Sequence, residues 1–348
     1  MKFILFCQNN YAFGILEPLK KVIVEKGHDY IWFVADKIVN EFPFKNENHT
    51  NIISDLEAYK SDVIFVPGNQ VPHYLRGLKT QIFHGLAGEK KGHFRIRHYF
   101  DLYLTQGPYF TDTFNQLKQK HQDFDVIETG WPKLDIYGRD KTLFNSEKEG
   151  LLKTYNAKTI LLYAPTFSPK LTSAPHLINH IKDLAENPDY LILLKFHPLM
   201  EKSWVDAYIS LSKEHKNIVY QTEKNIIKFL LISDLLISDT SSVIYEFILL
   251  DKPVVSFNNI SKNINWEDSS DYSQLVNLVE NNLKEDPFAK SRTYICEQFH
   301  PYNDGKSALR MVDTVCKYIQ ENGVPEKRKL SFLRRLKIYK IFGKPSKS

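Results

Sequence analysis

The stretch from Ser233 to Phe257 is the segment of this chain that most constrains its fold. A short apolar run at Leu235–Ile237 is typical of a buried strand, and Val254–Phe257 forms a second such run. Between them lie the hydroxyl-rich turn Asp239–Ser242 and a helical apolar stripe over Val243–Leu250. This order of strand, turn, helix and strand predicts a parallel sheet, because parallel strands need a crossover between them.

The turn at Asp239–Ser242 is a candidate site for binding an anion. A helix start presents unpaired amide groups, and the three hydroxyls of Thr240, Ser241 and Ser242 add neutral donors for phosphate oxygens. The alternative is an ordinary helix cap, which is the common role of such residues. A capping box starting at Ser242 would need Glu or Gln at position 245, where the chain has Tyr245. Glu246 comes one residue later and is a candidate for ligand binding.

The same alternation of strands and helices runs through the chain twice, which predicts an α/β protein with two doubly wound parallel-sheet domains facing each other across a cleft. We expect an N-terminal domain over residues 1–140, a second domain over 141–325 and a basic tail over 326–348, with the link between the domains inside residues 139–157. The expected strands of the first round are Phe3–Cys7, Ile31–Val34, Val63–Val66, Gln81–Phe83, Leu102–Leu104 and Val126–Ile127, with a helix at Ile15–Lys26. Those of the second round are Thr159–Tyr163, Leu191–Phe196, Ile218–Tyr220 and the two runs of the opening unit.

Composition excludes several classes of protein. The chain has 348 residues, 43% of them hydrophobic, which is enough for two cores and is not the composition of a disordered protein. Three cysteines at Cys7, Cys296 and Cys316 have no metal-site spacing and predict a reduced, cytoplasmic protein without zinc. The run Phe3–Cys7 is too short for a signal peptide, and no run is long enough to span a membrane.

Basic charge is concentrated at the C-terminal end. Residues 326–348 hold nine Lys or Arg and one acid, a net charge of +8 within a total of +5, so the rest of the chain is slightly acidic. This distribution argues against a nucleic-acid partner for the body. Phe332, Leu336 and Tyr339 give the tail a partial apolar stripe. We expect this tail to bind an anionic membrane surface, the alternative being a solvated tail.

Two histidines each end an apolar strand and precede a chain breaker. His84 is followed by Gly85, and His197 is followed by Pro198. Lys195 lies two residues before His197 and would share its strand face. Ligands of parallel sheets bind at the carboxyl ends of the strands, where Thr166 also lies, so both histidines are candidates for acid–base work or phosphate binding. A structural hydrogen-bonding role is the alternative for each.

Further polar residues are weaker candidates. A basic patch follows His84 and is either an anion site or a solvated loop; it comprises Lys90, Lys91, His93, Arg95, Arg97 and His98. Asp135 closes the motif WPKLD and Asp304 precedes Gly305, and each is either a site residue or a helix cap.

Several of these motifs together resemble the CDP-glycerol glycerophosphotransferase family, which makes teichoic-acid and capsule backbones from CDP-activated polyols. The resemblance covers roughly residues 80–310 and rests on His84-Gly85 followed by Lys90-Lys91, TGWPKLD, LLYAPTF, LLKFHP, SDLLISDTSSVIYEF with LDKPVV, and NDGKSA. It implies a GT-B type fold and no metal or other cofactor, and we find no DxD motif in these stretches.

The resemblance also implies site residues. The histidines of the family's HG and HP motifs fall on His84 and His197, its D-Y-S-S box on Asp239–Ser242, and its following acidic residue on Glu246. The chain departs from the family pattern at Leu86, which follows the HG pair in place of Thr, at Thr240 and at Phe167. The first departure concerns the acceptor side, and the other two concern the donor side.

The resulting prediction is a transferase that moves a polyol phosphate, glycerol phosphate by preference, from a CDP-polyol to a hydroxyl of a cell-surface polymer or lipid-linked acceptor, with release of CMP. His84 would take the acceptor proton, His197 and Lys195 would bind the phosphoryl oxygens, and the Asp239–Ser242 turn with Thr166 and Glu246 would hold the donor. Gly85, Lys90, Lys91, Arg95, Arg97 and Asp135 are the acceptor or loop candidates. The protein would act as a peripheral protein on the inner face of the plasma membrane.

Two other functions fit the same residues. One is a GT-B glycosyltransferase that uses a nucleotide sugar in capsule or surface polysaccharide synthesis, since the fold by itself does not separate donors. The other is a non-catalytic, membrane-associated binding protein. The sequence leaves open which polyol is used, which acceptor receives it, whether one unit or a polymer is added, and the oligomeric state.

Overall fold

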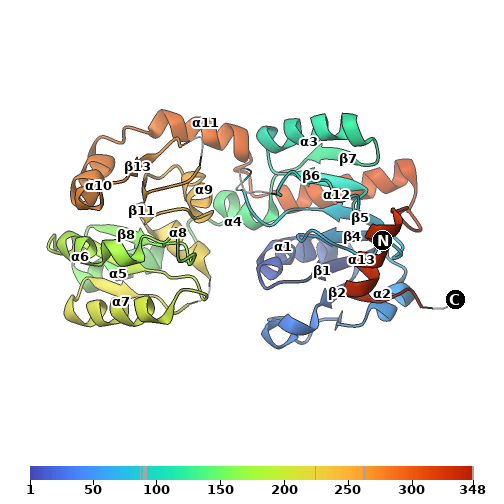
Figure 1. Cartoon of the computed structure of the whole chain (residues 1–348), viewed down its shortest axis with the longest axis horizontal. Coiled ribbons are helices and arrows are strands. Elements are labelled where there is room, and N and C mark those ends of the chain that lie inside the picture. Colours follow the sequence, from blue (N-terminus) through green and yellow to red (C-terminus); the bar gives the residue numbers. More distant parts are fainter. Residues whose placement is uncertain (87, 89–91, 224, 262–263, 347–348) are drawn as a thin grey trace. The chain divides into compact units, whose positions relative to one another are not determined.

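The structure is a computed structural model that describes residues 1–86, 88, 92–223, 225–261 and 264–346. The chain divides into two compact units, Met1–Arg139 with Gln298–Ser348 (unit 1) and Asp140–Glu297 (unit 2), which Figure 1 shows. This division differs from the one expected from the sequence on the C-terminal side. Residues 298–325, expected in the second domain, cluster with unit 1, and so does the basic tail.

Unit 1 is built on a parallel sheet which, among the described residues, has seven strands in the order β3-β2-β1-β4-β5-β6-β7. The strands are β1 (Lys2–Cys7), β2 (Asp29–Val34), β3 (His49–Thr50), β4 (Val63–Val66), β5 (Leu78–Gln81), β6 (Leu102–Thr105) and β7 (Asp125–Glu128). From β1 the chain builds outward through β2 and β3, and it then returns to build β4 to β7 on the other side. The neighbours β1 and β4 therefore mark the point where the strand order reverses.

Helices cover both faces of the unit 1 sheet (Figure 1). They are α1 (Tyr11–Glu25), α2 (Ile53–Tyr59), α3 (Pro108–His121), α4 (Asp135–Arg139), α12 (Ser307–Asn322) and α13 (Phe332–Phe342), and short 3-10 turns lie at Asp36–Glu41 and Pro132–Leu134. Alternate residues of β1 explain the two faces, since Ile4 and Phe6 join a core with Leu56 of α2 and Phe114 of α3. On the opposite face, α1 packs against α12.

Unit 2 has the same plan. Within the described residues its parallel sheet has six strands in the order β10-β9-β8-β11-β12-β13. They are β8 (Thr159–Tyr163), β9 (Tyr190–Leu194), β10 (Ile218–Tyr220), β11 (Leu235–Ser238), β12 (Val254–Phe257) and β13 (Glu267–Ser269). Here the strand order reverses between β8 and β11. The opening unit of the sequence is therefore found as β11, a turn, a helix and β12.

The helices of unit 2 also lie on both faces. They are α5 (Asn145–Tyr155), α6 (Ala174–Ala185), α7 (Lys202–Glu214), α8 (Ile226–Ile232), α9 (Val243–Ile248) and α10 (Leu275–Lys284), with a 3-10 turn at Tyr272–Gln274, while α11 (Ala289–Phe299) crosses into unit 1. The larger core joins α6, α7 and α10 to one face of the sheet, with Ile181 and Tyr208 fully buried in it.

Three sequence predictions of local structure are corrected. The strand expected at Gln81–Phe83 begins three residues earlier, as β5. The prediction missed its start because Lys79 and Thr80 are polar, although both are fully buried in the strand. Residues 139–157, expected to be a link, contain the helix α5. The helix α9 ends at Ile248, two residues before the expected Leu250.

The basic segment at the C-terminal end is part of the unit 1 fold. Arg328 donates from Nη1 to Oδ1 of Asp101 at 2.6 Å and from Nη2 to Oδ2 of Asp123 at 2.9 Å. Ile338 of α13 is fully buried in the core of unit 1, and Phe342 packs against that core. The segment thus differs from the separate arm expected from the sequence. Within the described part of the chain, every helix is too short or too polar to traverse a bilayer.

We predict that Ile338→Ala lowers the free energy of unfolding of the full chain by about 2–5 kcal/mol, since it leaves a cavity in a packed core. Ile341→Ala is the matched control, because it makes the same change in the same helix at a residue that is 43% exposed. We expect that variant to stay within about 0.5 kcal/mol of the wild type. Urea unfolding measures both, and equal losses would contradict the docking of α13 on unit 1.

Candidate functional site

The loops at the reversal point of unit 1 carry a group of polar and aromatic residues. Residues 8–10 follow β1, and residues 67–70 follow β4. In open parallel sheets, ligands bind beyond the carboxyl ends of the strands at such a point, because the two loops leave it in opposite directions. His84 reaches the same loops from the end of β5, as its ring is hydrogen-bonded to Pro67. His84 thus lies near the carboxyl end of a strand, and its role in binding a ligand stays a prediction.

The hydrogen bond to Pro67 fixes the tautomer of His84. Its Nδ1 lies 3.0 Å from the carbonyl oxygen of Pro67, and because a carbonyl only accepts, Nδ1 carries the hydrogen. In the neutral ring Nε2 then carries the lone pair, as a general base requires. The exposed ring stacks on Tyr11 with the ring centroids 4.9 Å apart. Phe83, directly before His84, has φ +60°, in the left-handed region.

Two further residues extend the contacts of His84, and neither was among the candidates chosen from the sequence. The Nδ2 group of Asn9 donates to the hydroxyl of Tyr11 at 3.1 Å, and Lys37 donates from Nζ to Oδ1 of Asn9 at 2.7 Å. Their common signal in the sequence is position, since Asn9 follows β1 and Lys37 follows β2. Considering every polar residue that follows a predicted strand would therefore have identified both residues as candidates.

The described residues of the basic patch after His84 lie in different surroundings. Lys90 and Lys91 lie outside the described residues. The ring of His93 stacks on Phe83 with 5.2 Å between centroids, and burial lowers the pKa of this histidine to about 4. Arg97 donates to Oδ1 of Asn69 at 3.2 Å, and Arg95 is exposed. Gly85 is held by its carbonyl oxygen, which accepts from Gln106 at 3.1 Å.

Both aspartates singled out in the sequence act at a helix start. The carboxylate of Asp135 accepts from the backbone N–H groups of Ser307 and Ala308, each at 2.8 Å, and so caps α12. Burial raises the pKa of Asp135. Asp304 accepts from the N–H of Lys306 and forms an ion pair with Arg310 at 2.6 Å. The geometry favours the helix-cap alternative for both residues.

In unit 2 the residues predicted to bind the CDP-polyol at Thr166 and Asp239–Ser242 lie at the reversal point between β8 and β11. The loop that begins at Ala164 follows β8, and Asp239–Ser242 follows β11. The two loops are tied together by the buried carboxylate of Asp239, which accepts from the N–H of Thr166 at 2.8 Å and from the N–H and hydroxyl of Ser173 at 2.8 and 2.9 Å. Asp239 therefore positions the Thr166 loop, and a direct ligand contact is not its main role.

The three hydroxyls after Asp239 are half-buried. Thr240 accepts at Oγ1 from the N–H of Ile260 at 3.3 Å, and Ser241 accepts at Oγ from the N–H of Val243 at 3.4 Å. Both hydroxyls keep their hydrogens available to a ligand in this geometry, because they act here as acceptors. Ser242 is the N-cap residue of α9 but makes no side-chain capping bond. The helix has only six residues, so its dipole adds less than the sequence implied. Glu246 lies within α9 and is 8% exposed.

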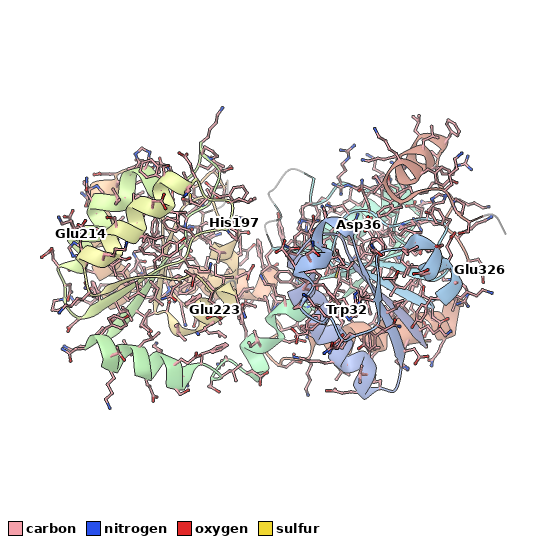
Figure 2. The ribbon with its side chains drawn as sticks, turned by 90° about the horizontal axis from the view of Figure 1, so that it is seen from below. Trp32, Asp36, His197, Glu214, Glu223 and Glu326 are labelled. Atoms are coloured by element: carbon pink, nitrogen blue, oxygen red, sulfur yellow. The ribbon has the colours of Figure 1, made fainter. Side chains whose placement is uncertain are left out.

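His197 has the opposite tautomer to His84. It follows β9 in unit 2, where Figure 2 labels it, and its Nδ1 accepts from the N–H of Leu199 at 3.1 Å. Nδ1 therefore has no hydrogen, and the neutral ring carries it on Nε2 as a donor. The ring stacks on Phe167 at 4.4 Å between centroids. Desolvation and the charge of Lys195 lower the pKa of His197, which favours the neutral ring.

Lys195 is buried beside this histidine. Its side chain is 7% exposed in total, and Nζ donates to the carbonyl oxygen of Phe196 at 3.3 Å. Desolvation lowers the pKa of Lys195, although Glu223 opposes the shift. The strand β9 ends at Leu194, so Lys195 and His197 belong to the loop and do not share a strand face as we expected.

The buried carboxyl of Asp239 is expected to make the stability of the protein depend on pH. Burial raises its pKa from 3.8 to about 6, so the folded state holds this proton more tightly than the unfolded chain does. Its contribution to stability is therefore present at low pH and is lost as the pH rises from about 4 to about 6, by an amount on the order of 3 kcal/mol. We predict that Asp239→Asn removes this decline, even if it lowers stability at every pH.

Urea unfolding of the full chain between pH 4 and pH 7 checks this prediction. Asp206→Asn, at an exposed position of α7, is the control and should keep the decline seen in the wild type. The same pH slope in Asp239→Asn and in the wild type would show that another group causes it.

The chain is similar to known proteins both in sequence and in fold. A family model for CDP-glycerol:poly(glycerophosphate) glycerophosphotransferases matches residues 80–262. The teichoic acid ribitol-phosphate polymerase TarK of Staphylococcus aureus (strain NCTC 8325 / PS 47) is 27% identical over 205 residues, which are 54% of this chain and 38% of the relative. A teichoic acid glycerol-phosphate primase of Bacillus spizizenii (strain ATCC 23059 / NRRL B-14472 / W23) is 31% identical over 160 residues, which are 45% of this chain and 40% of the relative. The chain therefore matches less than half the length of either protein.

Solved structures show the fold. The wall teichoic acid polymerase TagF superposes with a TM-score of 0.65 at 19% identity, over 92% of this chain and 88% of that chain. A UDP-GlcNAc 2-epimerase from Neisseria meningitidis superposes with a TM-score of 0.63 at 14% identity, over 91% of this chain and all of that chain. These likenesses confirm the predicted GT-B type fold. The match over residues 80–262 confirms the resemblance found in the motifs, and the chain belongs to the CDP-glycerol:poly(glycerophosphate) glycerophosphotransferase family.

Proposed function

We propose that this protein transfers a polyol phosphate from a CDP-polyol to a hydroxyl of a teichoic acid or related acceptor, with release of CMP. The observation that carries the proposal is the pair of opposite histidine tautomers. The neutral ring of His84 has its lone pair at Nε2, as a base needs, and that of His197 carries a hydrogen at Nε2, as a ligand of phosphoryl oxygens needs. Membership of the family supports the type of reaction.

In the proposed reaction, His84 takes the proton of the acceptor hydroxyl at Nε2. The acceptor oxygen attacks the phosphorus that carries the polyol, and the bond from that phosphorus to the bridging oxygen of the diphosphate breaks. CMP leaves with the electron pair of that bond. The reaction requires that a donor bound by unit 2 meets His84 of unit 1.

The residues of unit 2 would bind the donor. His197 donates from Nε2 to a phosphoryl oxygen, and Lys195 adds positive charge nearby. The hydroxyls of Thr240, Ser241 and Ser242 donate to the diphosphate, while Thr166 is placed beside them by Asp239. Glu246 is proposed to contact hydroxyls of the ribose or the polyol.

A panel of donors tests the reaction class. Release of CMP from CDP-glycerol or CDP-ribitol in the presence of a glycerol phosphate oligomer would support the proposal, and the better donor would identify the polyol. Glycerol is our first choice, although the relatives include ribitol-phosphate polymerases. Turnover of UDP- or CMP-sugars alone would replace the proposal with a glycosyltransferase. No turnover of any donor would favour a binding protein.

For the base we predict that His84→Gln lowers the rate of CMP release by about two to four powers of ten, the usual range for the loss of an acid–base group. His49→Gln is a matched control in the same unit. His49 is also exposed and also has Nδ1 beside a carbonyl oxygen, that of Glu47 at 2.8 Å, but it lies on β3 away from the reversal point. Turnover of His84→Gln within a factor of ten of the control would remove His84 from the mechanism.

We further propose that the exposed side of α13 binds an anionic membrane surface. Phe332 is 64% and Leu333 77% exposed, whereas Ile338 on the docked side is buried. Arg334, Lys337 and other cations alternate with these apolar residues, and each cation near an anionic surface contributes about 1 kcal/mol. Arg328 is excluded from this surface by its ion pairs with Asp101 and Asp123.

We predict that the double variant Phe332→Ser/Leu333→Ser binds phosphatidylglycerol vesicles at least about ten-fold more weakly than the wild type, because two apolar side chains no longer enter the interface. The control is Val24→Ser/Ile52→Ser, which removes two apolar side chains that are 51% and 53% exposed elsewhere on unit 1. Vesicle sedimentation measures binding. Equal binding by the two double variants would rule out this surface.

A further inference from the structure

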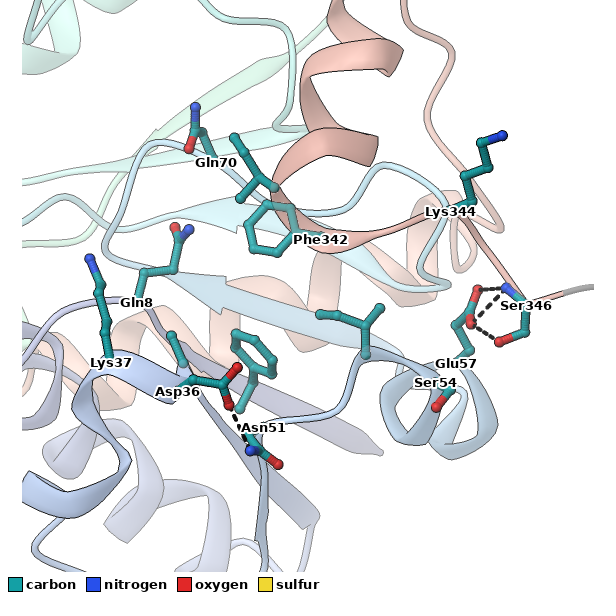
Figure 3. Close-up of a pocket in the computed structure, with 14 residues that line it drawn as sticks. Gln8, Asp36, Lys37, Asn51, Ser54, Glu57, Gln70, Phe342, Lys344 and Ser346 are labelled. Atoms are coloured by element: carbon teal, nitrogen blue, oxygen red, sulfur yellow. Dashed lines mark hydrogen bonds between the residues drawn. The ribbon is translucent and has the colours of Figure 1, made fainter.

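A cavity of about 640 Å³ opens in unit 1 beyond the carboxyl ends of the neighbouring strands β3, β2, β1 and β4. Gln8 from the loop after β1 and Gln70 from the loop after β4 line it, together with Asp36 and Lys37 after β2 (Figure 3). Its volume lies within the range of small-ligand pockets, which is roughly 300–1,000 Å³. The candidate residues of the sequence did not include any of these four.

The lining has the chemistry of a site for hydroxyl groups. Amides and a carboxylate from Gln8, Asp36, Asn51 and Gln70 offer both donors and acceptors, and Phe33 adds an apolar surface. Asn51 donates from Nδ2 to Oδ1 of Asp36 at 2.7 Å, which fixes the orientation of this carboxylate (Figure 3). Each of these groups can exchange hydrogen bonds with a polyol or a sugar.

The charges of the lining are balanced. Lys37 and Lys344 are matched in number by the acids Asp36 and Glu57, and Glu57 accepts from the N–H and hydroxyl of Ser346 (Figure 3). A lining without net charge does not select a polyanion, and its amides and carboxylates suit a neutral, hydroxyl-rich group. A single phosphate beside that group could be bound at the Lys37 end.

Hydrogen bonds connect the cavity to His84. Lys37 lines the cavity and donates to Asn9, which donates to the hydroxyl of Tyr11, whose ring stacks on His84. Gln8 also lines the cavity, and its side chain and the hydroxyl of Tyr11 both lie beside Gly68. A ligand in the cavity would therefore lie next to the residues that hold the proposed base.

One wall of the cavity comes from the C-terminal segment. Ile341 and Phe342 of α13 and the following Lys344 and Ser346 line it. Phe342 is fixed by an edge-on contact with Phe6, at 5.7 Å between ring centroids. The wall is thus held by the same docking that buries Ile338.

We propose that this cavity binds the hydroxyl-rich end of the acceptor, a polyol or sugar unit whose free hydroxyl is then presented to His84. The inference rests on the proposed function and adds to it the place and the chemical class of the acceptor. Asp36, Gln8 and Gln70 contact the hydroxyls, and Lys37 contacts the adjoining phosphate.

Equilibrium binding to the full chain tests this site without relying on turnover. The probes are a glycerol phosphate trimer and a ribitol phosphate trimer, each with a free terminal polyol, titrated by calorimetry. Ser54→Trp fills the cavity from an exposed position of α2, and we expect it to weaken binding of the probe about ten-fold or more. Ala58→Trp makes a similar change on the same helix outside the lining and should leave the dissociation constant within a factor of two.

A second variant protects the test against misfolding. Gln70→Ala removes hydrogen bonds without adding volume, and we expect it to weaken binding several-fold, since each lost hydrogen bond contributes about 0.5–1.5 kcal/mol. Binding that is unchanged in both Ser54→Trp and Gln70→Ala, or no binding of either trimer to the wild type, would overturn the inference. CMP release is measured separately, so a protein that binds a trimer in the cavity but turns over no CDP-polyol would contradict only the proposed reaction.

Discussion

The hydrogen-bonded pairing of two central parallel strands, β1 with β4 in unit 1 and β8 with β11 in unit 2, is the constraint on which the rest depends. Each pair joins strands whose following segments leave in opposite directions, so no crossover covers the edge between them. The polar residues after these four strands consequently gather at that edge. In unit 2 they include Thr166 and Asp239, which are tied together, and in unit 1 they include Gln8 and Gln70, which line the cavity.

Small differences in loop geometry give two histidines different chemistry. His84 and His197 both follow a strand and both stack on an aromatic ring. Nδ1 of His84 faces a carbonyl oxygen, whereas Nδ1 of His197 faces a backbone N–H. In the neutral rings the hydrogen is therefore on Nδ1 of His84 and on Nε2 of His197. A backbone group two or more residues away thereby decides whether Nε2 of the neutral ring accepts or donates a hydrogen bond.

Much of the fold was predictable because buried parallel strands form apolar runs, as in β4, β8 and β12, which lie where the sequence places them. The prediction failed at β5, since the fully buried Lys79 and Thr80 do not look like strand residues in a central position. The positions of His84 and His197 at loop starts were predictable for the same reason, but their tautomers were not. Those depend on Pro67 and Leu199, whose orientation follows from the folded loops. In α13 the sequence shows an apolar stripe at Phe332, Leu336 and Tyr339. The residue that docks on unit 1 is Ile338, which lies off this stripe.

The discontinuity of unit 1 has a consequence for how the chain is made. Unit 2 is one continuous segment, Asp140–Glu297, whereas unit 1 needs both the first 139 residues and the segment from Gln298 onward. A chain that emerges from the ribosome N-terminus first can complete its middle unit while the earlier one still lacks α12 and α13. Arg328 and Ile338 arrive last, so the carboxylates of Asp101 and Asp123 and the apolar face beneath α13 remain uncovered until translation of this segment ends. Unit 1 therefore cannot be completed before the whole of unit 2 has been synthesised.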